Sequence, residues 1–337
     1  MTAPGVLLYL QLMHKLKPSH KLILFIAGFL AINAFVTFAA FRYLPYDQNK
    51  RYRLEEEFTQ IEDTLNFLFI GNSHVNRGLE PDSIPNSWSF HGPTETAPYF
   101  YYRMRRVVKE MPQAAHYYVF PGEAGLAAFN PQPLIFMGDF WKDYFDFTEL
   151  AEHTDQPFYY YGMGLKLQLF PYHQFPAAIM FLSDLQRERR NYKKYLKDTW
   201  ADYDQFMKDT ILNYMLDRHE LIDALSTKTG LTYLHKMIDF AQEENLRLIF
   251  VKWPLQRIYI EEAKKRNFFT PKIEGKVDSL LRHSPNVRLI DYENAFDGND
   301  TLFMDPHHLS EIGKARFSVM LRDTLSAIYE ADFGVKP

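Results

Sequence analysis

The chain has 337 residues and a formal net charge of −4, with 38 Lys and Arg residues against 42 Asp and Glu residues. This length allows one large domain or two ordinary ones with a full hydrophobic core, and the interspersed charges argue against a general nucleic-acid partner. The sequence contains no Cys, which excludes disulfides, thiolate zinc sites and a cysteine nucleophile.

The first predicted element is an apolar helix near the N-terminus. Residues 22–41 carry no charge and include only two clearly polar side chains. Twenty helical residues, at about 1.5 Å each, span a hydrocarbon core of roughly 30 Å. Three lysines precede the run and favour a cytoplasmic N-terminus. We therefore predict a cytoplasmic N-terminus and one transmembrane anchor in residues 1–42, with a cleaved signal peptide as the alternative.

A linker over residues 43–64 precedes a region in which apolar strands and amphipathic helices alternate. The predicted strands cover residues 65–70, 88–90, 116–120, 247–252 and 287–291, and the predicted helices cover residues 98–110, 233–244, 259–266 and 310–329. This alternation is typical of parallel sheets covered by helices on both faces. We predict a three-layer αβα domain over residues 65–337 with a mainly parallel five-stranded sheet.

Residues 123–230 separate the third and fourth predicted strands, which is far longer than an ordinary strand–helix connection. We interpret this segment as a helical insertion. Its aromatic clusters, such as Phe140-Trp141 and the run at 158–161, fit either a satellite core or a surface that touches the bilayer or a membrane partner. A basic run at 186–198 indicates a solvated helix face, with contact to anionic headgroups as the alternative.

A candidate nucleophile follows the first strand directly. In Gly71-Asn72-Ser73-His74 the serine stands where the strand ends, and open α/β sheets bind ligands at the carboxyl ends of their strands. If a helix begins there, its free N–H groups face any oxyanion that forms. A plain turn serine is the alternative for this motif alone.

A candidate base and its orienting acid lie more than two hundred residues later, in Asp305-Pro306-His307-His308-Leu309. Residues three apart can point to one side of a helical turn. The Asp305 carboxylate can then hold Nδ1–H of His308 and leave Nε2 for a serine, which needs such a base to become nucleophilic. A helix cap with surface histidines is the alternative. We expect no metal and no cofactor, because His and carboxylates nowhere take zinc-ligand spacing.

Together, Gly71-Asn72-Ser73 and the late pattern Asp305-x-x-His308-Leu309-Ser310-x-x-Gly313 resemble the SGNH (GDSL-like) hydrolase superfamily. The resemblance extends from residue 65 to about residue 329, apart from the insertion. It implies Ser73 as nucleophile, His308 as base and Asp305 as the acid that orients the base. It also implies an oxyanion hole built from the main chain of Ser73 and Gly92, whereas the asparagine that family members add is missing from positions 119–123.

Within that superfamily, the anchor and the run Phe250-Val251-Lys252-Trp253-Pro254 are most similar to bacterial O-acyltransferases of cell-surface polysaccharides. The resemblance implies transfer of an acyl group, such as acetyl, to hydroxyls of an extracytoplasmic glycan. It also implies a single-pass protein of the cytoplasmic membrane, partnered by a multi-pass membrane-bound O-acyltransferase or a polysaccharide synthase. An esterase or deacetylase, and a catalytically silent subunit that binds a membrane partner or a glycan, are the alternatives.

Overall fold

The computed structural model describes residues 17–43, 54–61, 64–92, 94–131, 133–134, 140–169, 197–223, 227–266 and 271–337. Its centre is a five-stranded sheet of β1 (Leu65–Gly71), β2 (Ser87–His91), β3 (Ala115–Pro121), β4 (Arg247–Lys252) and β5 (Val287–Asp291). The strands lie in the order β2-β1-β3-β4-β5, and every neighbouring pair is parallel. The predicted α/β fold with a parallel five-stranded sheet is therefore confirmed.

Burial of β1 explains the layered architecture. All seven of its residues are buried, as expected for a strand covered on both faces. Phe67 and Phe69 belong to the hydrophobic core on one face, whereas Leu68 and Ile70 belong to the core on the other. Successive side chains of a strand point to opposite faces, so one apolar run supplies both cores.

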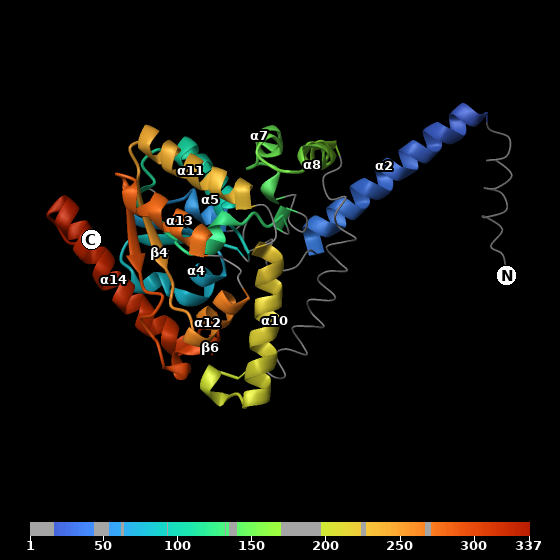
Figure 1. Ribbon diagram of the computed structural model, residues 1–337. Helices are drawn as coiled ribbons and strands as arrows, with labels where there is room; N and C mark the ends of the chain where they lie inside the picture. The colour runs from blue at the N-terminus through green and yellow to red at the C-terminus, as the bar shows by residue number, and fades with distance from the viewer. Residues whose placement is uncertain are drawn as a thin grey trace.

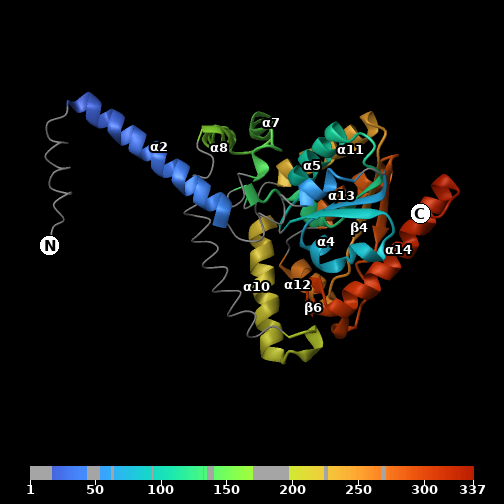
Figure 2. The same cartoon turned by 180° about the vertical axis from the view of Figure 1, so that it is seen from behind.

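Helices cover both faces of the sheet (Figures 1 and 2). The core that contains Leu68 also contains residues of α5 (Ala97–Glu110), α11 (Thr227–Glu243) and α13 (Pro271–His283). The core that contains Phe67 also contains residues of α4 (Ser73–Gly78) and α14 (Glu311–Phe333). Helices α5, α11 and α14 follow the sequence prediction with shifted ends, as does α12 (Arg257–Lys265). Helix α13 was not predicted.

Short elements complete the described fold. They are α12 (Arg257–Lys265), the 3-10 turns η1 (Pro81–Ser83) and η4 (Asp300–Leu302), and the two-stranded hairpin β6 (Phe303–Asp305) and β7 (His308–Leu309). The hairpin leads directly into α14, whose N-cap is Ser310; its Oγ accepts from the Gly313 N–H at 3.1 Å. A Cβ on Gly313 would lie 1.9 Å from the Leu302 carbonyl oxygen. Glycine there lets α14 approach η4 closely, and this approach fixes the hairpin in between.

The described part of the insertion is helical: η2 (Ala124–Ala127), α7 (Phe147–Glu152), α8 (Pro157–Leu169), η3 (Trp200–Asp202) and α10 (Gln205–Asp223). Trp141 is fully buried and packs edge-on against Tyr99 of α5, with ring centroids 4.9 Å apart. Trp141 and Phe140 thus belong to the same hydrophobic core as Leu68 of β1, and not to a separate satellite core. On α8, by contrast, the side chain of Phe158 is 90% exposed. Most of the basic run, at residues 186–196, lies outside the described residues.

The apolar N-terminal segment forms α2 (Pro18–Tyr43), which projects from the sheet domain in both views (Figures 1 and 2). Phe25 and Phe35 on this helix are each 70% exposed. Within the described residues, none of the helices combines the length and apolarity that crossing a membrane requires.

Candidate active site

Ser73 is the first residue of α4 and follows β1 after a single residue. That residue, Asn72, is the N-cap of α4, and its Oδ1 accepts the His74 N–H at 2.9 Å. A Cβ on Gly71 would lie 2.1 Å from Cγ2 of Val75, so the turn from β1 into α4 needs glycine for this close approach. The local sequence thus places the serine hydroxyl at the carboxyl edge of the sheet.

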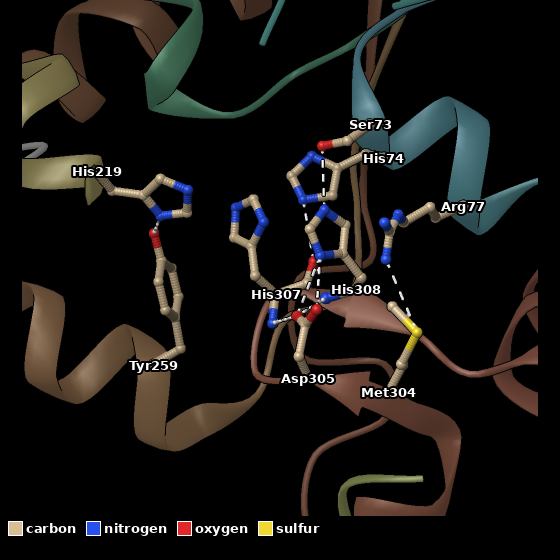
Figure 3. Close-up of polar contacts among 9 residues, drawn as sticks. All are labelled: Ser73, His74, Arg77, His219, Tyr259, Met304, Asp305, His307 and His308. Carbon is tan, nitrogen blue, oxygen red and sulfur yellow. Dashed lines mark hydrogen bonds and ion pairs between the residues drawn. The ribbon is translucent and has the colours of Figure 1, made fainter. Parts of the chain in front are cut away.

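The structure brings Ser73, His308 and Asp305 together (Figure 3). Nε2 of His308 lies 3.0 Å from Oγ of Ser73, and Nδ1 lies 2.9 Å and 3.1 Å from the two carboxylate oxygens of Asp305. A carboxylate only accepts, so Nδ1 carries the proton and Nε2 presents its lone pair to the serine hydroxyl. This arrangement can take the proton from Ser73.

The backbone that holds the base differs from the predicted helical turn. Asp305 and His308 are paired residues of the antiparallel β6–β7 hairpin. Oδ1 of Asp305 also accepts the main-chain N–H groups of His307 and His308, each at 2.9 Å. One carboxylate therefore shapes the hairpin turn and orients the imidazole. The three-residue spacing correctly indicated that the side chains of Asp305 and His308 meet. They meet because Asp305 caps the turn of a β-hairpin, and not because the backbone is helical.

The electrostatics suit a base that is neutral at pH 7. Burial lowers the pKa of His308 below its usual value, and the Asp305 carboxylate opposes this only in part. Burial alone would raise the pKa of Asp305, but His308 and the hydrogen bonds to the carboxylate hold that pKa below its usual value. The pair is therefore a neutral imidazole beside an ionised carboxylate.

A cavity of about 160 Å³ opens beside Ser73. Its lining includes Thr96, Glu123, His219, Tyr259 and His307, together with the buried Lys252. Lys252 forms ion pairs with Asp278 at 2.9 Å and Glu274 at 3.5 Å. Among the described residues, no group of three or more acidic or histidine side chains is arranged to hold a metal ion.

His74 fastens the hairpin from the side of α4. Its Nε2 donates to the main-chain carbonyl of His307 at 3.1 Å. Its Nδ1 lies 2.6 Å from Oε1 of Glu123, close enough for an ion pair although the two atoms do not meet hydrogen-bond geometry. The histidine after the proposed nucleophile thus links α4 to the hairpin that carries the proposed base.

Gly92 does not take the expected place. Its N–H donates to the Gly71 carbonyl at 3.0 Å and so extends the β1–β2 ladder by one residue. Gly92 is also not among the described residues that line the cavity. The resemblance implied a main-chain donor at Gly92, but the pairing of β1 with β2 uses this N–H. An oxyanion hole in this cavity therefore needs a donor other than Gly92.

Thr96 is a cavity residue that the sequence analysis missed. Its side chain is only 7% exposed, and its hydroxyl has no hydrogen-bond partner within the described part of the chain. It is the N-cap of α5 but makes no capping hydrogen bond with its side chain. Thr before Ala97-Pro98 is a recognisable helix start, so the sequence held a signal for its position. Beyond β4, Tyr259 lines the cavity, whereas Trp253 packs against Phe317 in the core.

No protein-family model matches the chain, and no curated protein matches it. Among solved structures, it is similar to a GDSL-like lipase from Bacteroides thetaiotaomicron, with 9% identity, a TM-score of 0.39, and coverage of 82% of this chain and 98% of the lipase. A Bacteroides fragilis protein provisionally described as an acylhydrolase shows 13% identity and a TM-score of 0.38, with 85% and 100% of the two chains covered.

A protein from Streptococcus pneumonia, provisionally described as a platelet activating factor, shows 10% identity and a TM-score of 0.35, with 88% and 98% covered. Because all three TM-scores are below 0.5, function is argued from the site itself.

Proposed function

We propose that this protein is a serine-dependent O-acyltransferase that works through an acyl-enzyme on Ser73. The observation that carries this proposal is the continuous hydrogen-bonded chain from Oγ of Ser73 through His308 to Asp305. A serine hydroxyl becomes a useful nucleophile only when an adjacent base takes its proton and a third group orients that base. The chain supplies both partners at 2.9–3.0 Å.

In the first half-reaction, Oγ of Ser73 attacks the carbonyl carbon of an acyl donor while its proton moves to Nε2 of His308. The ionised Asp305 stabilises the resulting imidazolium without taking the proton itself. The bond from the carbonyl carbon to the donor oxygen then breaks, and the donor alcohol leaves with the proton from Nε2. Ser73 is left as an ester.

In the second half-reaction, an acceptor hydroxyl gives its proton to Nε2 of His308 while its oxygen attacks the acyl carbon. The Ser73 ester bond breaks, and Oγ regains the proton from Nε2. Water and an alcohol are equivalent nucleophiles for these atoms, so the choice between hydrolysis and transfer depends on which acceptor the cavity binds.

The main-chain N–H of Ser73 and the hydroxyl of Thr96 are the proposed donors to the developing oxyanion. The Ser73 N–H lies at the start of α4, where helix N–H groups have no intrahelical partner. The Thr96 hydroxyl is buried in the cavity wall without a partner among the described residues. Preorganised donors at this position stabilise the tetrahedral intermediate.

The proposed reaction is transfer of a short acyl group, such as acetyl, to hydroxyls of an extracytoplasmic polysaccharide. The sequence resemblance supports a short acyl group. The proposal places the protein at the bacterial cytoplasmic membrane, and the exposed apolar side chains of α2, such as Phe25 and Phe35, support contact with a lipid surface. A multi-pass membrane-bound O-acyltransferase would supply the acyl group; the sequence resemblance supports this partner.

The test compares glycan acylation in cells that carry Ser73→Ala with cells that carry Ser279→Ala, an exposed serine on α13. The proposal predicts that ester-linked acyl groups disappear from the surface glycan in the Ser73 variant and remain in the control. Unchanged glycan acylation in the Ser73→Ala cells, with the protein present at normal level, would overturn the proposal.

A further inference from the structure

The His307 ring is surrounded by other aromatic rings and is not a member of the triad. Its ring centroid lies 4.2 Å from that of His74, 4.5 Å from that of His219 and 5.1 Å from that of Tyr259. It also lies edge-on to His308 at 5.0 Å. Figure 3 shows the His307 ring between the His219–Tyr259 pair on one side and the triad on the other. The ring lines the cavity that contains Ser73.

Nδ1 of His307 has no hydrogen-bond partner that would explain its burial: it is buried and makes no hydrogen bond within the described residues. Leaving a buried polar group unpaired is destabilising, and such groups in folded proteins call for an explanation such as a catalytic or ligand-binding role. By contrast, the neighbouring His219 is engaged, with Nδ1 2.7 Å from the Tyr259 hydroxyl.

Both polar main-chain groups of His307 already have hydrogen-bond partners. Its N–H donates to Asp305 and its carbonyl accepts from His74. Both contacts involve main-chain atoms, so they do not require an imidazole at this position. The side chain is therefore not needed to hold the hairpin, and its placement in the cavity wall needs a separate reason.

His307 is uncharged at neutral pH. Burial lowers its pKa well below the usual value, and the neighbouring His74, His219 and His308 lower it further. The other titratable groups nearby are the Tyr259 hydroxyl, whose pKa is raised by burial, and Glu123, which contacts His74. A neutral imidazole carries one N–H donor and one acceptor nitrogen. This pair complements a hydroxyl group, which both donates and accepts.

We propose that His307 is an acceptor-binding residue: its imidazole hydrogen bonds to a second hydroxyl of a polyhydroxylated acyl acceptor while a first hydroxyl faces Ser73 and His308. This inference rests on the proposed acyl transfer and adds the residue that selects the acceptor. A lone alcohol or water reaches the acyl-serine but leaves the His307 ring unpaired. Sites built to bind a hydroxyl discriminate against ligands that lack it, because the buried polar group then stays unsatisfied.

The experiment acetylates the purified full-length protein with p-nitrophenyl acetate in the presence of either methyl glucoside or n-propanol. The readout is the ratio of acetylated alcohol to free acetate, which does not depend on how fast Ser73 is acylated. The variants are His307→Phe, which removes the hydrogen-bonding atoms, and His307→Gln, which retains a donor and an acceptor. His116→Phe is the matched control, since His116 also packs in an aromatic cluster but lies near the start of β3, at the opposite end of the strand from the cavity.

We expect His307→Phe to lower the transfer ratio for methyl glucoside about tenfold or more, consistent with loss of a hydrogen bond and an unpaired acceptor hydroxyl. The ratio for n-propanol should change less than about twofold, His307→Gln should recover most of the glucoside transfer, and His116→Phe should match the wild type. Removing a buried unpaired nitrogen should not lower the melting temperature of His307→Phe.

Two results would overturn the inference while leaving the acyl-enzyme intact. One is an unchanged glucoside ratio in His307→Phe; the other is an equal fall for glucoside and n-propanol, which indicates a general distortion of the site. A wild type that acetylates Ser73 but gives only free acetate also overturns it. If the wild type never acetylates Ser73, the proposed function fails first, and this inference fails with it.

Discussion

The catalytic triad and the other polar groups of the cavity wall differ in how their polar atoms are satisfied. In the triad, Ser73, His308 and Asp305 form an unbroken set of hydrogen bonds. Elsewhere in the cavity wall, the Thr96 hydroxyl and Nδ1 of His307 are buried without partners in the described part of the chain. The groups that would activate the nucleophile thus have their hydrogen-bond partners, whereas the groups that would contact the substrate lack them within the described residues.

This difference has separate consequences for reactivity and for stability. A satisfied triad is preorganised, so little rearrangement is needed when the reaction begins. Unpaired groups such as the Thr96 hydroxyl reduce the stability of the empty protein, and in the proposed mechanism they gain a partner when the oxyanion or the acceptor binds. The predictions below alter either the triad or the unpaired groups, in order of decreasing expected effect.

The largest effect is expected from Ser73→Ala. Without Oγ no acyl-enzyme forms, so single-turnover release of p-nitrophenol from p-nitrophenyl acetate should fall about 10⁴-fold or more. Ser279→Ala on α13 should retain the wild-type rate. A Ser73→Ala rate within tenfold of wild type would show that another group carries the reaction.

Asp305→Asn should lower the acylation rate about 10³–10⁴-fold. The amide oxygen can still accept the N–H groups of His307 and His308, so the hairpin should persist, but the amide N–H₂ facing Nδ1 would favour the wrong imidazole tautomer. Asp291→Asn is the control, since Oδ1 of Asp291 accepts the Glu293 N–H in a similar turn at 3.0 Å. Equal rates for the two variants would remove Asp305 from the mechanism.

Thr96→Val should lower kcat for acylation about 10–100-fold with little change in KM, because an oxyanion donor acts mainly in the transition state. Thr96→Ser keeps the hydroxyl and should stay near the wild type. The free energy of unfolding should not fall in Thr96→Val, because the removed hydroxyl is buried without a partner among the described residues. A normal kcat in Thr96→Val would place the second oxyanion donor elsewhere.

The pH dependence of acylation tests the protonation state of His308 without any substitution. The reaction needs neutral His308, and burial lowers the pKa of that imidazole below 6.5. The rate should therefore be constant near pH 7 and fall as the pH drops, with its midpoint below 6.5. A midpoint above pH 7 in the acylation rate would contradict the buried, neutral base.

The sequence was sufficient to predict the sheet because its inner strands contain apolar runs, such as residues 67–70 in β1 and residues 248–251 in β4. Strand β4 was predicted to the residue, at Arg247–Lys252. Helix α13 was missed because its apolar face, which includes Val277 and Leu281, is short and is separated by charged residues. Its burial depends on packing against the sheet, which a local pattern does not contain.

For the site, the spacing of Asp305 and His308 and the strand end before Ser73 predicted which three residues meet. The family resemblance implied Gly92 as an oxyanion donor, but the Gly92 N–H is used by the β1–β2 ladder, which the sequence does not reveal. The sequence also could not identify His307 or Thr96 as unpaired cavity residues. Whether a polar atom is satisfied depends on contacts between distant segments.

The most direct test of the central claim is rapid-quench mass spectrometry of the full-length protein mixed with p-nitrophenyl acetate. The account predicts one acetyl group per protein, mapped by peptide analysis to Ser73, that appears at the rate of p-nitrophenol release and then decays. Release of p-nitrophenol without acetyl-Ser73, or equal acetylation of wild type and Ser73→Ala, would contradict it.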